Sequence, residues 1–397
     1  MLLFFCLSIS YILSRLSRSL GLPNIIGPLI MGFIISIPVV REIALDPVSE
    51  SAISTLAEIG MIFLLFFIGS KVELANFKKM SRRSMYIALF SAGVPFAFGF
   101  FIVTLMGYDM TTALIIAMCL SVSAEAVSIS VLDEFNLVKT RFGQLIVNAG
   151  IIDDVVELVF LGLIGVIVSS SSSRGQELFH FLGDVLIFVM LIYSVRFVFI
   201  PLIWKLIQIK HTKADLFIAS FIIVFFIAAS SHYFKLGSVI GALFAGMVVK
   251  NNLLKSGNVL REENEVEKII EMITVGFLAP IFFISIGLNT DFTILFSEPA
   301  LVTTLIIIAL VGKLFGSIVG NYVGGGHHFM HGTIIGWGMN ARGAVELIVI
   351  EIARSYMSIP TSVYSAIVFM AFATTIISPI VFKQLMKKNL NFIRRKI

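Results

Sequence analysis

Charged side chains are scarce in this chain of 397 residues. Asp, Glu, Lys and Arg make up 13% of the sequence, whereas 58% of the residues are hydrophobic and 37 are Phe. So few polar groups cannot cover the water-facing surface of a globular domain of this length. Because helices satisfy their own backbone hydrogen bonds in lipid, the composition predicts an all-α polytopic membrane protein.

Cysteine is nearly absent, and the two that occur, Cys6 and Cys119, lie in apolar stretches. A disulfide framework or a thiolate metal cluster is therefore not expected. The sequence also lacks a Gly-x-Gly-x-x-Gly motif, so we expect no attached nucleotide-binding module and no cofactor. The net charge of +5 is explained by membrane topology and contact with anionic lipid, and we expect no nucleic-acid partner.

Long apolar runs are abundant instead. A helix needs about 20 apolar residues to cross the hydrocarbon core of a bilayer. The sequence predicts about thirteen such helices, at residues 1–17, 23–40, 53–72, 83–107, 111–133, 142–169, 177–208, 213–232, 235–252, 265–288, 299–323, 329–357 and 361–387. The loops between them are short, so we expect one integral membrane domain over residues 1–397.

Lys and Arg gather in alternate predicted loops, as they do in short cytoplasmic loops of membrane proteins. Most of the 29 lie around residues 15–18, 71–83, 139–141, 205–213 and 250–268, and in the tail from residue 383. The opposite loops hold only Arg41, Arg174, Lys235 and Arg354. This asymmetry predicts a multi-pass protein of the plasma or inner membrane with a cytoplasmic C-terminus and an external N-terminus.

Two groups of three predicted helices are similar to one another. Segments 83–107, 111–133 and 142–169 form one triplet, and segments 299–323, 329–357 and 361–387 form the other. The middle member of each is interrupted by small or polar residues, at 120–130 and at 336–346. Matched interruptions in two halves indicate an inverted repeat with two broken helices that cross near the middle of the membrane.

Two adjacent acids, Asp153 and Asp154, interrupt a long apolar run. Ionisable groups at such depth are costly and usually line a water-filled path or bind an ion. Neighbours on a helix point about 100° apart, which suits one acid facing a partner helix and the other an aqueous cavity. Repulsion between them favours protonation of one near neutral pH. The alternative is a buried acid paired for stability alone.

Lys313 carries a positive charge, opposite to that of the two aspartates, and it also lies within a predicted span. It lies beside Gly312, Gly316 and Gly320, a spacing that lets another helix approach closely. A lysine there is expected to pair with a facing carboxylate. The alternative, a side chain that snorkels to the membrane surface, is disfavoured by its position in the middle of the span.

Further polar residues are expected to extend this path. Glu157 lies one turn beyond Asp153, and Arg342 and Glu346 have the spacing of an ion pair on one helix, either a brace or a gate. The supporting set is Ser123, Glu125, Asn148, Glu157, Asn340, Arg342 and Glu346. His327, His328 and His331 crowd one loop; they fit a solvated loop, a metal site or a pH sensor.

Taken in order, these segments resemble the monovalent cation/proton antiporter superfamily, the sodium/hydrogen exchanger family, in its paired-aspartate branch. The resemblance covers nearly the whole chain. It rests on Leu20–Gly32, Ala57–Gly69, Thr140–Ile146 followed by Asp153 and Asp154, Gly312-Lys313, and Gly338–Glu346.

The resemblance implies a homodimer with a moving core and a panel that dimerises. The core would comprise about 83–169 and 299–387, the panel about 1–72 and 213–288, and a linker helix about 177–208. Asp154 would bind a cation and protons in turn, Asp153 would pair with Lys313, and the two acids would be the ligands of a Na⁺ ion. Exchange would be electrogenic, with two protons for one Na⁺ or Li⁺.

Two residues depart from the family pattern. Glu125-Ala126 stands where Thr-Ser is common, and Glu157 stands where a small residue is common. Both substitutions add negative charge near the site, so they bear directly on the coupling ratio and on the preference for one ion over another.

Two other functions share features with this sequence. A K⁺/H⁺ antiporter or K⁺ efflux system of the same architecture remains an alternative, although the paired acids and the lack of a nucleotide-binding module disfavour it. An intramembrane aspartyl protease needs two aspartates from different helices, whereas Asp153 and Asp154 are contiguous. We therefore expect a transporter and not an enzyme.

Overall fold

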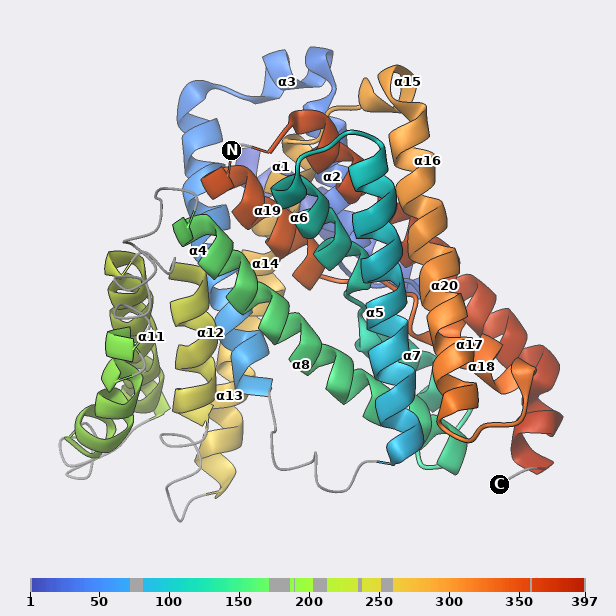
Figure 1. The fold of residues 1–397 in the computed structure, drawn as a ribbon. Helices are drawn as coiled ribbons and strands as arrows, with labels where there is room; N and C mark the ends of the chain where they lie inside the picture. Colours follow the sequence, from blue (N-terminus) through green and yellow to red (C-terminus); the bar gives the residue numbers. More distant parts are fainter. Residues whose placement is uncertain are drawn as a thin grey trace. The chain divides into compact units, whose positions relative to one another are not determined.

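The structure is a computed structural model that describes residues 2–71, 81–170, 186–188, 190–202, 213–234, 238–250, 260–357 and 359–395. The described residues are mostly helical and contain no strand (Figure 1). The prediction of an all-α protein is therefore confirmed. Two residues of the predicted loops, Arg174 and Lys235, lie outside the described residues. The same is true of half of the predicted linker helix 177–208, of which only residues 186–188 and 190–202 are described.

The chain divides into two compact units. Unit 1 comprises Met1–Leu45, Leu74–Phe160 and Ile286–Ile397, and unit 2 comprises Asp46–Glu73 and Leu161–Ser285. Each unit therefore joins segments that are far apart in the sequence. The functional division into a core and a panel stays a prediction.

Except for the end of segment 142–169, which belongs to unit 2, unit 1 holds both predicted triplets. Its helices are α1 Leu2–Ser19, α2 Ile26–Ser36, α3 Pro38–Ala44, α5 Arg82–Leu105, α6 Met110–Ser121, α7 Glu125–Glu134, the first part of α8 Arg141–Ser170, α15 Ile294–Ser297, α16 Pro299–Ile307, the π-helical turn η5 Ile308–Gly312, α17 Lys313–Val323, α18 Phe329–Gly338, α19 Val345–Met357 and α20 Thr361–Arg395.

Unit 2 holds α4 and the helices of the middle of the chain. They are α4 Pro47–Lys71, the π-helical turn η2 Val195–Phe199, α11 Lys213–Tyr233, α12 Ser238–Val248, α13 Leu260–Ile273, the π-helical turn η4 Thr274–Leu278, and most of α14 Ala279–Leu288. Within it, Lys71 and Lys250 both form ion pairs with Glu267, the first at 3.1 Å, and these contacts join α4, α12 and α13.

Seven described helices are long and apolar enough to cross a membrane, or eight if the bent pair Ile26–Ser36 and Pro38–Ala44 is one span. They are Leu2–Ser19, Pro47–Lys71, Arg82–Leu105, Met110–Glu134, Val266–Leu288, Pro299–Val323 and Thr361–Leu390. The chain is thus a multi-pass membrane protein, as predicted, whereas the count of about thirteen spans stays a prediction.

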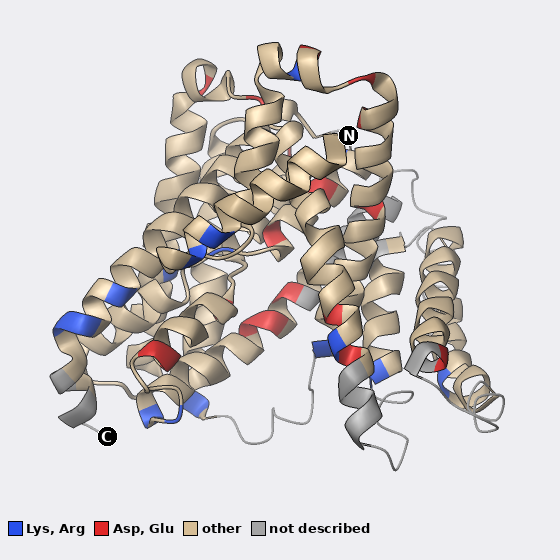
Figure 2. Cartoon of the chain, turned by 180° about the vertical axis from the view of Figure 1, so that it is seen from behind, with Lys and Arg blue, Asp and Glu red and all other residues tan. Residues whose placement is uncertain are grey.

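Both middle members of the triplets are broken, as the sequence predicts. The first consists of α6 and α7 with an interruption at 122–124, and the second of α18 and α19 with an interruption at 339–344. Each lies between long helices in the sequence: α5 and α8 flank the first, and the α16–α17 helix and α20 flank the second. In unit 1, most Lys and Arg gather toward the end where the C-terminus lies (Figure 2).

The start of the first broken helix follows from local sequence. Gly107 adopts φ +92° after α5 ends, a left-handed conformation that glycine takes without steric cost. Asp109 then caps α6 by accepting hydrogen bonds from the amides of Thr111 and Thr112, each at 3.0 Å, which satisfies two of the free N–H groups at the helix start.

The glycine row beside Lys313 packs directly on α5. A Cβ on Gly320 would lie 2.5 Å from the Tyr86 carbonyl oxygen, and one on Gly312 would lie 3.1 Å from Pro95 Cα. A Cβ on Gly316 would clash with the Phe90 carbonyl oxygen. The close helix contact expected from the glycine spacing is therefore present, and it sets Lys313 against α5.

The α5–α17 contact yields the first prediction. We expect Gly316→Val to lower the free energy of unfolding by about 1–3 kcal/mol, because the added side chain forces the α5 backbone away. Gly93→Val on α5 is the matched control, since a Cβ there meets no described atom within 4 Å. The measurement is the apparent melting temperature in detergent. Equal melting temperatures for both variants would contradict the packing.

Candidate functional site

The two helix interruptions are bonded to one another. Val122 and Ala124 have extended backbone conformations, and the Ala124 amide donates to the Ala341 carbonyl oxygen at 2.7 Å. The Ser128 hydroxyl donates to the Gly338 carbonyl oxygen. The breaks therefore cross at one place in unit 1, where backbone groups that a regular helix would satisfy find partners in the other break.

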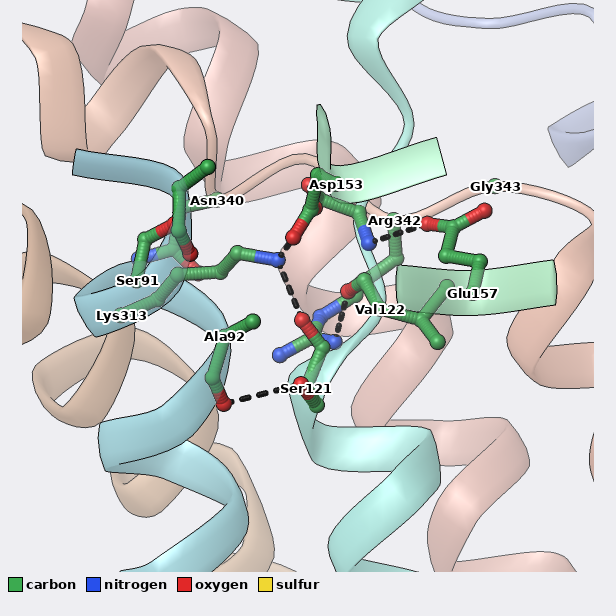
Figure 3. Close-up of polar contacts among 12 residues, drawn as sticks. Ser91, Ala92, Ser121, Val122, Asp153, Glu157, Lys313, Asn340, Arg342 and Gly343 are labelled. Atoms are coloured by element: carbon green, nitrogen blue, oxygen red, sulfur yellow. Dashed lines mark hydrogen bonds and ion pairs between the residues drawn. The ribbon is translucent and has the colours of Figure 1, made fainter. Parts of the chain in front are cut away.

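Arg342 binds carbonyl groups at the C-terminal end of α6. Its side chain is fully buried and donates to the carbonyl oxygens of Cys119 at 2.9 Å, Leu120 at 2.6 Å and Val122. These carbonyls are the free acceptors at a helix C-terminus, where positive charge is favoured. Figure 3 shows the guanidinium beside Ser121 and Val122.

The ion pair expected between Arg342 and Glu346 from their spacing is replaced by other contacts. Arg342 lies in the break, because α19 begins only at Val345, so the helical spacing rule does not apply to it. The Glu346 side chain points toward the N-terminus of α19, where its Oε1 accepts a hydrogen bond from the Gly343 amide at 2.6 Å. Glu346 Oε2 is buried without a hydrogen bond from any described residue.

Asp153 and Lys313 form a buried ion pair. Lys313 Nζ lies 3.1 Å from Asp153 Oδ2, and the two residues are 0% and 1% exposed. Lys313 also donates to the Ser121 carbonyl oxygen at 2.5 Å, which places the ammonium group against the break of the first helix (Figure 3). Asp153 Oδ1 has no hydrogen bond from the described residues.

Asp154 has the opposite environment from its neighbour. Its side chain is exposed whereas Asp153 is buried, as the angle between adjacent helical residues requires. The pair therefore has one acid that is anchored to Lys313 and one whose side chain is exposed. The binding role of either acid stays a prediction.

Two residues of the supporting set hold α8 to the first break. The Ser123 amide donates to Glu157 Oε1 at 2.9 Å, and the Ser123 hydroxyl donates to Asp153 Oδ2. Glu157 is 4% exposed. Ser123 thus bridges two acids one helical turn apart, and both face the extended segment between α6 and α7.

Glu125 begins α7 and reaches the same face of α8. A Cβ on Gly150 would overlap the Glu125 carboxyl group, so this glycine provides the space in which the carboxyl lies. Glu125 Oε1 is buried without a hydrogen bond from any described residue. Asn148 is half-buried on α8, and the structure assigns it no contact in this group.

Asn340 connects the second break to the helix that carries Lys313. Its side-chain amide donates to the Leu310 carbonyl oxygen at 2.8 Å, within the π-helical turn that ends immediately before Lys313. The Ser378 hydroxyl donates to the Asn340 carbonyl oxygen at 3.1 Å. Single π turns in helices frequently mark functional sites.

Sequence reasoning missed several backbone contacts of the site. The Ser121 hydroxyl donates to the Ala92 carbonyl oxygen at 2.8 Å (Figure 3), and Thr375 Oγ1 donates to the Arg342 carbonyl oxygen at 3.2 Å. The hydroxyl-rich run at 120–130 was a signal for Ser121. The sequence around Thr375 offered no comparable signal.

Acids outnumber bases in this part of unit 1. The carboxyl groups belong to Glu125, Asp153, Asp154, Glu157 and Glu346, and the cationic groups belong to Lys313 and Arg342. Uncompensated charge in a low-dielectric environment is expensive. The buried acids of this group therefore outnumber the two cations that could compensate their charge.

Two of the three histidines lie beside one another. His328 and His331 lie with ring centroids 5.4 Å apart, and His331 lies 5.4 Å from the Phe142 ring. Among the residues that the structure describes, no group of three or more His, Cys, Asp or Glu is arranged to hold a metal ion. The interpretation of the histidines as a metal site therefore gains no support.

The sequence matches a family described as "Sodium/hydrogen exchanger, transmembrane" over residues 4–388. This match extends over almost the whole chain and includes every residue of the site. The chain belongs to the sodium/hydrogen exchanger family, as its motifs predict. Members of this family are transporters and not enzymes, so the expectation of a transporter is confirmed.

Two curated relatives are similar over nearly their full lengths. The chain is 26% identical to a Na⁺/H⁺ antiporter of Enterococcus hirae over 94% of each chain. It is also 26% identical to the Na⁺/H⁺-K⁺ antiporter GerN of Bacillus cereus, over 92% of this chain and 90% of GerN.

A solved structure has the same fold. The sodium proton antiporter MjNhaP1 from Methanocaldococcus jannaschii superimposes with a TM-score of 0.59 over 98% of this chain and 96% of that chain, at 13% sequence identity. At this identity the likeness concerns the fold alone.

The buried ion pair yields the second prediction. Lys313→Met should lower the free energy of unfolding by about 3–5 kcal/mol, because it leaves Asp153 buried without its partner. Combining it with Asp153→Asn removes the stranded charge, so the double variant should be more stable than Lys313→Met. The measurement is thermal unfolding in detergent at one pH. A double variant that loses the full sum of both single effects would contradict the pairing.

Proposed function

We propose that this protein is a secondary antiporter that exchanges Na⁺ or Li⁺ for protons across the membrane, with Asp154 as the carrier of both ions. The observation that carries this proposal is the environment of the paired acids. Asp154 is exposed, whereas its neighbour Asp153 is held by Lys313 at 3.1 Å beside the crossing of two broken helices. Membership of the sodium/hydrogen exchanger family supports the same function.

The chemistry follows from a single carboxylate with two exclusive states. A carboxylate accepts a proton or coordinates a hard monovalent cation, and occupancy by one excludes the other. Backbone groups at helix breaks are the usual additional ligands of such ions. Since Arg342 occupies the carbonyls at the end of α6, the ligands that complete the site are water and the remaining oxygens near Asp154.

The second acid supports electrogenic exchange. Asp153 and Lys313 are buried together, so a change in their pairing moves a proton on or off one of them. Two protons moving against one monovalent cation transfer one net charge per cycle. This stoichiometry is part of the proposal, as is the Na⁺ ligand role of both aspartates.

Alternating access requires one part of the protein to move against another. We propose a core that carries the site and moves against a panel, with the linker helix joining them in the sequence; the division of the chain into two compact units supports a protein with two parts. A homodimer formed by the panel, surrounding lipid, and a plasma-membrane location with a cytoplasmic C-terminus complete the proposal.

Exchange of K⁺ for protons is a second candidate. The relative GerN is a Na⁺/H⁺-K⁺ antiporter, and a carboxylate does not by itself reject K⁺. Proteoliposomes that contain a pH-sensitive dye, exposed to NaCl, LiCl or KCl in turn, separate the candidates. Valinomycin clamps the voltage with Na⁺ and Li⁺ and is left out with K⁺. If K⁺ drives proton efflux and neither Na⁺ nor Li⁺ does, the protein is a K⁺/H⁺ antiporter and the Na⁺ assignment is wrong.

The site assignment yields the third prediction. Asp154→Asn should abolish cation-driven proton efflux, because an amide neither holds the proton nor carries the charge. Asp153→Asn should reduce the rate at least tenfold by releasing Lys313. Asp133→Asn, an exposed acid of α7, is the matched control and should exchange normally. Normal transport by Asp154→Asn would show that the assignment is wrong.

Competition yields the fourth prediction. When the external pH is lowered, protons occupy the carrier carboxylate more often, so the apparent KM for Na⁺ should rise while the maximal rate at saturating Na⁺ changes less. The measurement is the initial exchange rate as a function of Na⁺ concentration at several pH values. A KM that does not depend on pH would exclude competition at one site.

A further inference from the structure

We propose that Glu125 is an additional proton-carrying carboxyl of the exchange cycle, and that Gly150 forms the notch that holds it next to the aspartate pair. This inference rests on the proposed antiport function and adds a residue to it. Its consequence is that each cation transported moves one more proton than the aspartate pair alone would couple.

The position of Glu125 is defined by α8. Its carboxyl group occupies the space where any side chain at position 150 would begin. Glu125 is the first residue of α7, so the break before it, at 122–124, directs the side chain across to α8. Only glycine at position 150 leaves room for a carboxyl group this close to the α8 backbone.

The notch lies on the acidic face of α8. Residues 150, 153, 154 and 157 are three, four and seven positions apart, so they share one face of the helix. Side chains of a helix lean toward its N-terminus, and Asp153 and Asp154 therefore lean back toward Gly150. The charged groups that act on Glu125 are Asp154, Asp153 and Glu157 on α8 and Lys313 on α17.

Glu125 Oε1 is buried and accepts no hydrogen bond from the described residues. A buried carboxylate oxygen without a donor is costly, whereas a protonated carboxyl is neutral and can donate to a neighbouring carboxylate. Two acids that face one another share a proton readily. A proton on Glu125 would therefore remove the cost of this orphaned oxygen when no cation is bound.

The proposed cycle accounts for every proton. With the cation site empty, the aspartate pair and Glu125 hold protons. A cation that binds at Asp154 displaces the two protons that the proposed function assigns to the aspartate pair, and Glu125 releases its own proton to the same aqueous side. After the cation leaves on the other side, the aspartate pair and Glu125 take up protons there and return to their neutral forms.

A structural role is the alternative for this residue. An acid in the first turn of a helix interacts favourably with the helix dipole, and this would stabilise α7 without any part in transport. Such a role changes the melting temperature but leaves the number of protons exchanged for each cation unaltered, so the proton count separates the two roles.

The experiment counts protons released for each Na⁺ bound. Purified full-length protein in weakly buffered detergent solution is titrated with NaCl, the released protons are measured with a pH electrode, and bound Na⁺ is measured with ²²Na⁺. We expect Glu125→Gln to release one proton fewer than the unaltered protein. Glu134→Gln, at the other end of α7 and paired with Lys383 at 2.7 Å, should release the same number as the unaltered protein.

The notch is tested separately from the charge. Gly150→Ala retains Glu125 but displaces its carboxyl, so it should also lower the proton count, whereas Gly162→Ala on the same helix should not, because a Cβ there meets no described atom within 4 Å. In a Glu125→Ser background the carboxyl is gone, and Gly150→Ala should then have no further effect on the count.

Reconstituted protein supplies the second measurement. At zero membrane voltage, the pH gradient that just halts Na⁺ flux gives the coupling number directly, and it should be one lower in Glu125→Gln. An unchanged coupling number or an unchanged proton count in Glu125→Gln would overturn the inference. So would a folded Glu125→Gln protein that no longer binds ²²Na⁺, since Glu125 would then be a cation ligand. If the unaltered protein neither binds Na⁺ nor exchanges it, the proposed function itself fails.

Discussion

A helix that is interrupted inside a membrane leaves carbonyl and amide groups without helical partners, in surroundings where water does not reach them. The rest of this site is arranged around that constraint. Arg342 covers three carbonyls at the end of α6, and Lys313 covers a fourth, that of Ser121. Both cations are fully buried, so they require acids nearby. The acids of α8 and of the two breaks supply that negative charge. The need to satisfy broken backbone groups thus explains why charged residues gather where the two breaks meet.

Much of this arrangement could be predicted from the sequence. Apolar run length indicates the spans, and small or polar residues inside two runs indicate both breaks, because these patterns depend only on composition within a window. The approach of α17 to α5 follows from Gly316 and Gly320, whose spacing places them on one helix face. The adjacency of Asp153 and Asp154 predicts that they point in different directions, and the structure has one buried and one exposed.

The features of the site that could not be predicted depend on where a helix begins again after a break and on which distant residues the fold brings together. Arg342 and Glu346 have helical spacing, yet α19 begins between them, and a window of sequence does not reveal that boundary. Glu125 packs against α8 at Gly150, where the lack of a side chain leaves room for its carboxyl group. A single glycine in a helix does not reveal which residue packs against it. Likewise, Asn340 reaches a carbonyl thirty positions earlier, which is a property of tertiary packing alone.

The π-helical turn at Ile308–Gly312 has a consequence for the length of the chain. A π turn contains one residue more than an α turn of the same hydrogen-bonded ladder. Deleting one residue from it would restore a regular helix and leave the hydropathy of the span almost unaltered. Because the shorter α turn covers about the same rotation as the longer π turn, Lys313 would keep its direction toward Asp153. The Leu310 carbonyl that accepts the Asn340 amide lies inside this turn, so the extra residue matters for the tie between the second break and this helix.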